Sequence, residues 1–271
     1  MRLILSAAML IVGTVLVVGA SQDPLPFSHA SFDQLLQTYV DAEGRVDYLG
    51  LQAASGSLGG YLDSLASVSP TNQPDRFPGP ADELAYWINA YNAFVLWGVV
   101  QAYPVDSVKD IALLNGFFRR LTFRAGGQEM TLDHIENKII RPLYQEPRIH
   151  FVVNCGAVSC PPLGRRAMSG EKLDEQLQQA LEQVVRNSQF VRLDPSSGTL
   201  HLSKIFDWFG GDFIDWFPAD QPHGPNGPTL VDYLLPYLPA ATDQHLRQHP
   251  ETAIVFDDYD WALNSQPSIA K

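Results

Sequence analysis

The sequence predicts an α+β fold: a single globular domain with a buried central helix and a small, mostly antiparallel sheet. Apolar residues at helical spacing dominate the first half of the chain, and short β-rich segments follow in the second half. No internal repeat or clean linker divides the 271 residues. We therefore expect a signal peptide over 1–20, a leader over 21–30, one domain over 31–265 and a tail over 266–271.

The N-terminus has the pattern of a secretory signal peptide. Arg2 precedes an apolar run from Leu3 to Val18, and small residues follow, so we expect cleavage near Ala20. An uncleaved anchor is the alternative, although a membrane span needs ~20 apolar residues. No later segment is long and apolar enough to cross a membrane. We therefore expect an exported protein, periplasmic or extracellular, with no membrane span after cleavage.

The charge of the chain excludes one class of partner. Without Arg2, 17 of the 18 Lys and Arg residues remain against 30 Asp and Glu residues, which gives a formal charge of −13. An acidic surface repels phosphate backbones, so we expect no nucleic-acid partner. The expected substrate is a small molecule or a peptide, no cofactor is indicated, and the oligomeric state is left open.

Hydrophobic periodicity assigns the elements of the first half. Apolar positions predict helices over 32–40 and 58–65, with a short extended piece over 45–48 between them. The Pro, Asn and Gly residues of 69–82 predict a loop. Residues 84–101 are apolar on every side, which predicts a helix buried in the middle of the domain.

A third helix is predicted over 131–141, with Thr131 as its N-cap and Pro142 as its end. Glu136 lies within the apolar stripe of this helix. A carboxylate in that position is costly unless it is paired. It would either hold an arginine, Arg141 or Arg148, or orient a histidine.

The second half is predicted to alternate short strands and helices. A β-rich run predicts a strand over 149–153, and an amphipathic pattern predicts a helix over 173–185. A Pro-Ser-Ser-Gly turn predicts a hairpin over 191–202. Helical residues over 230–238 and a late strand over 253–256 complete the order.

Both cysteines lie in one short segment, shortly after His150. A thiol attacks as its thiolate, and His150 is the nearest candidate base. On a regular strand His150 and Cys155 would face opposite sides, whereas a turn at Gly156 could return Cys160 towards the histidine. The sequence does not decide which of the two thiols is the nucleophile.

A Cys–His pair usually has a third group that orients the imidazole. Glu136 is the first candidate for this role and Asn154 is the second. Asn89 and Asn92 share one face of the central helix. Their side chains could bind the backbone of a neighbouring loop. Alternatively, they could orient a ligand or donate hydrogen bonds to an oxyanion. Arg148 is a further candidate for binding substrate.

Other interpretations of the thiol segment stay open. In an oxidising compartment, two cysteines at this spacing could form a small-loop disulfide. His150 could be a structural residue. Together with His134, Cys155 and Cys160 could hold zinc, but the C-x4-C spacing is not that of a standard zinc knuckle, and no metal site is predicted.

Several sequence blocks occur in a specific order along the chain. They are AYWINAYNA (85–93), LDHIEN (132–137), RIHF (148–151), NC (154–155), CPPL (160–163), LSKIF (202–206) and YDWALN (259–264). In this combination, from about 32 to 264, the chain resembles the bacterial branch of the domain-of-unknown-function 547 family. The resemblance implies an exported or envelope-associated protein whose activity is unassigned. A fold that is papain-like in a broad sense is an analogy.

Three functions are compatible with these residues. The first is a thiol hydrolase for a peptide, an amide or a thiol-containing small molecule, with His150 as base, Glu136 as its orienter and either cysteine as nucleophile. The second is a non-enzymatic envelope module whose ligand pocket is shaped by a disulfide and by the aromatic cluster of Trp208, Phe209, Trp216 and Phe217. The third is a redox module in which the two cysteines cycle.

Overall fold

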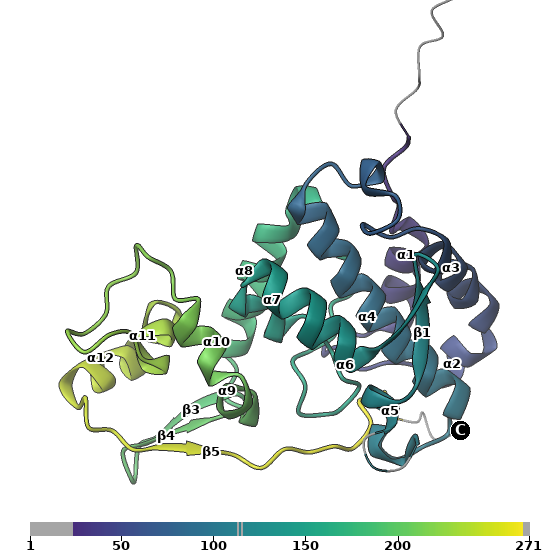
Figure 1. Cartoon of the computed structure of the whole chain (residues 1–271). Helices are drawn as coiled ribbons and strands as arrows, with labels where there is room; N and C mark the ends of the chain where they lie inside the picture. The colour runs from purple at the N-terminus through teal and green to yellow at the C-terminus, as the bar shows by residue number, and fades with distance from the viewer. Residues whose placement is uncertain (1–23, 113, 115, 268–271) are drawn as a thin grey trace, which may run out of the picture.

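A long helix, α4 (Pro80–Ala102), runs through the middle of the molecule, with the other helices of the first half packed around it (Figure 1). From Leu84 to Val100 nearly every residue is buried, so the predicted central helix is confirmed. Pro80 occupies the first turn of the helix, where its missing N–H costs nothing. The helix therefore forms the framework on which the first hydrophobic cluster is built.

The computed structural model describes residues 24–112, 114 and 116–267. The expected signal peptide and its cleavage site lie outside the described residues, as does most of the expected tail. About half of the described chain is helical, with two small sheets, so the fold is α+β as predicted. None of the helices in these ranges is long and apolar enough to span a membrane.

The helices predicted over 32–40 and 58–65 are confirmed as α1 (Ala30–Tyr39) and α3 (Ser55–Ser67). A further helix, α2 (Tyr48–Ala53), lies between them. Helix α2 was not predicted, because only the extended piece before it has a clear pattern. Val46 does form a bridge with Val40, and the Asp47 side chain then caps α2 by accepting from the Gly50 amide at 2.8 Å.

The segment that holds Glu136 is more irregular than predicted. It consists of α6 (Leu132–His134), a π-helical segment η3 (Ile135–Ile140) and α7 (Arg141–Tyr144). Thr131 is the N-cap, as predicted, but Pro142 does not end the helix, which continues to Tyr144. Because Pro142 has no N–H, the α-helical ladder is interrupted before it, and the wider π turns occupy that interval.

The predicted strand over 149–153 is wrong. Residues Pro147–Phe151 form a 3-10 helix, η4, which Glu146 caps by accepting from the Arg148 amide at 3.0 Å. A proline in the first turn and a side-chain cap favour a helical turn, and together they outweigh the β propensity of Ile149 and the valines that follow.

Two small sheets complete the fold. A hairpin that was not predicted pairs β1 (Thr122–Ala125) with β2 (Gln128–Thr131) through Gly126 and Gly127, both with positive φ. The predicted hairpin is confirmed as β3 (Val191–Asp194) and β4 (Thr199–Leu202), and β5 (Ile254–Phe256) adds to β4 in parallel. The predicted late strand is thereby also confirmed.

A second hydrophobic cluster lies beside the first, at the left of Figure 1. Helix α8 (Leu173–Val185), predicted with these bounds, joins the two clusters: Leu173 and Leu177 pack in the first, Leu181 and Val184 in the second. The second cluster also contains α9 (Lys204–Trp208), α10 (Gly210–Asp215), α11 (Leu230–Leu234), η6 (Leu235–Tyr237) and α12 (Ala240–Gln248). The remaining short elements are η1 (Pro74–Arg76), η2 (Val108–Asp110), α5 (Gly116–Arg119) and η5 (Gly170–Lys172).

The chain after β5 runs back from the second cluster to the first, as the yellow segment along the lower edge of Figure 1 shows. We call residues 257–267 the C-terminal strap. Isolated bridges fix the strap at Ala262, Leu263 and Ser265, whose partners are Ser107, Ala157 and Val46 respectively. The strap therefore holds the two clusters together, and it covers the loop that carries the cysteines.

Candidate functional site

The structure brings Glu136, His150, Cys155 and Cys160 to the wall of one cavity of about 320 Å³. The cavity lies where the two hydrophobic clusters meet. Glu136 comes from η3, His150 from η4, and the cysteines from the loop that follows η4. Aromatic side chains form much of the remaining wall: Tyr91, Phe118, Trp208, Phe209, Tyr259 and Trp261.

Asparagine side chains hold the cysteine loop in place. Asn92 donates to the Val152 carbonyl at 2.9 Å and accepts from the Asn154 amide at 2.9 Å. Asn154 in turn donates to the Pro161 carbonyl and accepts from the Gly156 amide, both at 2.8 Å. A buried amide that meets both its donor and its acceptor needs in this way fixes loop backbone on a rigid helix.

The catalytic interpretation of the helix asparagines is therefore replaced by a structural one. Asn89 makes a reciprocal pair with the backbone of Met168, at 2.8 and 2.9 Å, while Asn92 binds the cysteine loop. Both amides bind backbone groups, and neither side chain lines the cavity, so neither is placed to donate to an oxyanion there. Asn154 likewise anchors the loop instead of orienting His150.

Cys160 is the centre of a small set of hydrogen-bond donors. Its sulfur accepts from the Cys155 amide at 3.0 Å and from the Tyr259 hydroxyl at 3.2 Å. The same hydroxyl lies 3.2 Å from the sulfur of Cys155. Both cysteines are free, so the disulfide interpretation does not describe this structure. Cys160 is 7% exposed, and Cys155 is only partly buried.

These contacts shift the pKa values of the two thiols in opposite directions. Burial alone would raise the pKa of Cys160, but hydrogen bonds from the Cys155 thiol, from Tyr259 and from the backbone of Cys155 and Ala157 outweigh it and lower the pKa. The hydrogen bond to Cys160, followed by burial, raises the pKa of Cys155 well above its ordinary value. Burial also raises the pKa of Tyr259, which therefore stays a donor. Cys160 is thus the more acidic of the two thiols, and Cys155 the less acidic one.

His150 is paired with a carboxylate other than the predicted one. Its Nε2 lies 2.8 Å from Oδ2 of Asp212 on α10, and Arg141 holds the same carboxylate by two bonds of 2.7 and 2.8 Å. The imidazole stacks on Phe209, with ring centroids 4.0 Å apart. Glu136 does not orient His150: Asp212 holds the ring at Nε2, and the carboxylate of Glu136 binds Tyr91 instead.

The protonation state of the pair follows from its surroundings. Burial lowers the pKa of His150 despite its bond to Asp212, so the ring is neutral at pH 7. Burial would raise the pKa of Asp212, but the hydrogen bonds from His150 and Arg141 outweigh it and hold the pKa at about 2. An ionised carboxylate only accepts, so Nε2 of His150 carries the proton and Nδ1 carries the lone pair of a base.

Glu136 has a different partner from either predicted one. The Tyr91 hydroxyl on α4 donates to its Oε2 at 3.2 Å. Burial raises the pKa of Glu136 to about 7, although the hydrogen bond from Tyr91 and the charge of Arg141 both oppose that rise. The carboxyl group is therefore close to half ionised at neutral pH.

Arg148 is not part of the wall of the cavity. Its guanidinium binds Glu146 at 2.7 Å and Asp174 at 2.8 Å. Glu146 lies only two residues away and already caps η4, so the pair forms locally and turns Arg148 away from the site. Across the described ranges, no group of three or more His, Cys, Asp or Glu side chains is arranged to hold a metal ion.

Two residues of the site were missed by the sequence reasoning. Asp212 lies 62 residues after His150, and Tyr259 lies 99 residues after Cys160. Asp212 follows two glycines in an aromatic segment that also contains Asp207 and Asp215, and the local pattern does not distinguish it from these two carboxylates. Tyr259 is the first residue of the YDWALN block that resembles the family. The block does not indicate that Tyr259 contacts the cysteines.

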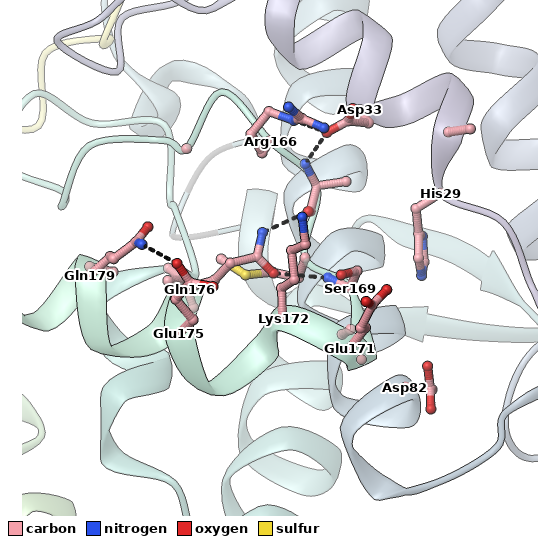
Figure 2. A pocket seen from close by; sticks show the side chains of 18 of the residues that line it. His29, Asp33, Asp82, Arg166, Ser169, Glu171, Lys172, Glu175, Gln176 and Gln179 are labelled. Atoms are coloured by element: carbon pink, nitrogen blue, oxygen red, sulfur yellow. Dashed lines mark hydrogen bonds and ion pairs between the residues drawn. The ribbon is translucent and has the colours of Figure 1, made fainter.

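A second and larger cavity, of about 840 Å³, lies between α1, the loop before η5 and the start of α8 (Figure 2). Several of its polar side chains are bound within the protein: Asp33 holds Arg166, Gln176 binds the backbone of Ala167 and Ser169, and Gln179 binds Glu175. Neither cysteine lines this cavity. The smaller cavity is therefore the candidate site.

The fold and this cavity define an α+β protein with a paired-thiol site. Residues 76–185 match the family model described as "Protein of unknown function, DUF547". This match supports the DUF547 family that the sequence blocks resemble. It includes the helix asparagines, Glu136, His150 and both cysteines, but it ends before Asp212 and Tyr259. No curated protein and no solved structure matches the chain.

Proposed function

We propose that the protein is an exported cysteine hydrolase that cleaves thioesters or similarly activated esters of small molecules. The observation that carries this proposal is the environment of Cys160. Its sulfur accepts a backbone amide and a tyrosine hydroxyl while it lines a cavity that also contains a histidine paired with a carboxylate. Donors fixed around a thiolate stabilise the nucleophilic form without a histidine ion pair. Export is supported by the N-terminal apolar run.

The first step is attack by the Cys160 thiolate on the carbonyl carbon of the substrate. A carbon–sulfur bond forms, the bond to the leaving group breaks, and the leaving group departs with the electron pair. His150 is neutral, and its one ring proton lies on Nε2, which donates it to the hydrogen bond with Asp212. The ring therefore has no proton to give to the leaving group at this stage. The site therefore suits leaving groups that are stable as anions, such as thiolates, and disfavours amides.

The second step is hydrolysis of the acyl-enzyme. A water molecule attacks the thioester at Cys160 while Nδ1 of His150 accepts its proton, and Asp212 stabilises the imidazolium that forms. The carbon–sulfur bond breaks, and the thiolate of Cys160 is regenerated. The proton taken up by His150 balances the anion released in the first step, so one ester and one water give one acid and one thiol or alcohol.

Thiol–disulfide exchange is a second candidate, favoured by the Tyr259 hydroxyl that contacts both sulfurs. Here the Cys160 thiolate would attack a small-molecule disulfide and release one thiol. Cys155 would then displace the second thiol, leaving a disulfide between the two cysteines and two reduced thiols in solution. A cavity built only for this exchange has no use for the His150–Asp212 pair, which is why hydrolysis is placed first.

Trapping of the acyl-enzyme tests the proposed hydrolysis. Reduced protein is mixed with p-nitrophenyl acetate, quenched in acid and mapped by peptide mass spectrometry. We expect acetylation at Cys160, transient in the unsubstituted protein and persistent in His150→Gln, because water attack has lost its base. A slow, scattered acetylation of lysines in both proteins would contradict the proposal. Rapid formation of an internal disulfide with oxidised glutathione, without acetylation, would favour the redox candidate.

A further inference from the structure

The proposed hydrolysis leaves two carboxylates of the cavity wall without a role, Asp133 and Glu136, of which Asp133 pairs with Arg119 at 3.5 Å. Glu136 lines the cavity, and among the described residues its carboxylate receives a hydrogen bond from the Tyr91 hydroxyl alone, at 3.2 Å. In the part of the chain that the structure describes, no ion pair joins Glu136 to a Lys or Arg side chain. The nearby Arg141 is bound through two nitrogens to Asp212 instead. A carboxylate on a cavity wall that forms no ion pair is suited to pair with a cation that a ligand brings.

The aromatic wall of the same cavity gives an independent indication. Trp208, Tyr259 and Trp261 are in mutual contact, with ring centroids 4.7 to 5.8 Å apart. The ammonium of Lys109 already lies 4.1 Å from the ring centroid of Trp261. Aromatic faces attract organic cations, and this cluster does so within the protein itself.

We propose that the cavity binds a small molecule with an ammonium group, which pairs with Glu136 and packs against the rings of Trp208 and Tyr259. The substrate would then be a thioester or ester that carries a positive charge, an extension that rests on the hydrolysis proposed above. The opposite assignment is that Glu136, when protonated, donates a hydrogen bond to a substrate carbonyl or carboxylate. The two assignments differ in the sign of ligand charge and in the direction of pH dependence.

The pH dependence follows from the groups around Glu136. Those that face it are Tyr91 on α4, Asp133 on α6, Arg141 on α7 and Asp212 on α10, and burial is the main reason why the pKa is raised to about 7. An ammonium ligand binds the ionised carboxylate, so its affinity should fall as the pH falls below about 7. A ligand that accepts a hydrogen bond from the protonated acid should show the opposite trend.

Isothermal titration calorimetry with three unreactive ligands of similar shape tests the proposal: phenethylamine, phenethyl alcohol and hydrocinnamate. At mildly alkaline pH we expect the amine to bind about tenfold tighter than the alcohol, in line with one charge pair plus a ring contact. Hydrocinnamate should bind weakest. The advantage of the amine should shrink at mildly acidic pH, where the amine itself is still charged.

A matched pair of variants locates the effect. Glu136→Gln keeps a side-chain oxygen for Tyr91 but removes the charge, and should abolish both the preference for the amine and its pH dependence. Glu129→Gln removes an exposed charge from the hairpin and should leave both unchanged. The ligand series in the unsubstituted protein is informative even if Glu136→Gln does not fold.

The outcomes separate this proposal from the hydrolysis. Tighter binding of hydrocinnamate at acidic pH, or equal binding of all three ligands, would overturn the cation site whatever the thiols do. Selective amine binding together with an inert Cys160 would support the cation site while contradicting the hydrolase.

Discussion

Replacing Cys160 by alanine is expected to reduce hydrolysis of an activated ester by at least about a thousandfold, to the background rate of the buffer. Loss of the nucleophile in a covalent mechanism removes the whole reaction path, and losses of this size are usual for such residues. The measurement is the initial rate of p-nitrophenolate release by reduced protein. Because Cys160 lies in a buried loop, each variant must first give the same circular dichroism spectrum as the unsubstituted protein.

Cys155→Ser is the matched control for this prediction. The change keeps the Cys155 backbone amide that donates to Cys160 at 3.0 Å and supplies a hydroxyl in place of the thiol. We expect this variant to retain hydrolysis at a reduced rate, since one donor to the thiolate is altered and the others remain. Equal loss in both variants would show that ester hydrolysis needs both thiols, and would contradict the assignment of Cys160 alone as the nucleophile.

Asp212→Asn is expected to lower the free energy of unfolding by about 2–3 kcal/mol at neutral pH, less than for a fully buried ion pair because Arg141 is partly exposed. Asp212 is 9% exposed in its side chain and Arg141 is 28% exposed. The substitution leaves the guanidinium without its counter-charge in an enclosed place. Urea unfolding followed by tryptophan fluorescence measures the effect. Asp215→Asn, an exposed change on the same helix, should alter stability by less than about 0.5 kcal/mol.

The same substitution should change how stability depends on pH. Because the pKa of Asp212 in the folded protein is depressed to about 2, its contribution is present above the unfolded-state pKa and is lost as the pH falls through the folded value. The unsubstituted protein should therefore lose this part of its stability between about pH 4 and pH 2. Asp212→Asn should lack that component. A variant as stable as the unsubstituted protein at neutral pH would show that the pair contributes nothing.

Local sequence pattern was sufficient for much of the fold. The apolar periodicity of α8 and the all-round apolar character of α4 each have a single physical explanation, namely burial of one face or of the whole helix. The Pro-Ser-Ser-Gly turn likewise predicted the hairpin of β3 and β4 correctly. The pattern failed at η4, where a proline and the Glu146 cap, rather than hydrophobicity, determine the backbone.

The candidate site was predictable only where its residues are close in sequence. His150, Cys155 and Cys160 share one segment, and Glu136 stood out as a carboxylate in an apolar stripe. The pairing of His150 with Asp212 depends on how α10 packs against η4, and the contact of Tyr259 with Cys160 depends on the path of the C-terminal strap. Such contacts are set by tertiary packing, and the pattern of a single sequence does not show which distant residues will meet.

The central proposal is that fixed donors favour the thiolate form of Cys160. The most direct measurement is the pH dependence of its alkylation by iodoacetamide, with each cysteine quantified by peptide mass spectrometry, in the unsubstituted protein and in Tyr259→Phe. We predict that Cys160 reacts before Cys155, with a midpoint below the value of about 8.5 for an ordinary cysteine, and that Tyr259→Phe raises this midpoint. A midpoint for Cys160 at or above the ordinary value, unchanged by Tyr259→Phe, would contradict the account.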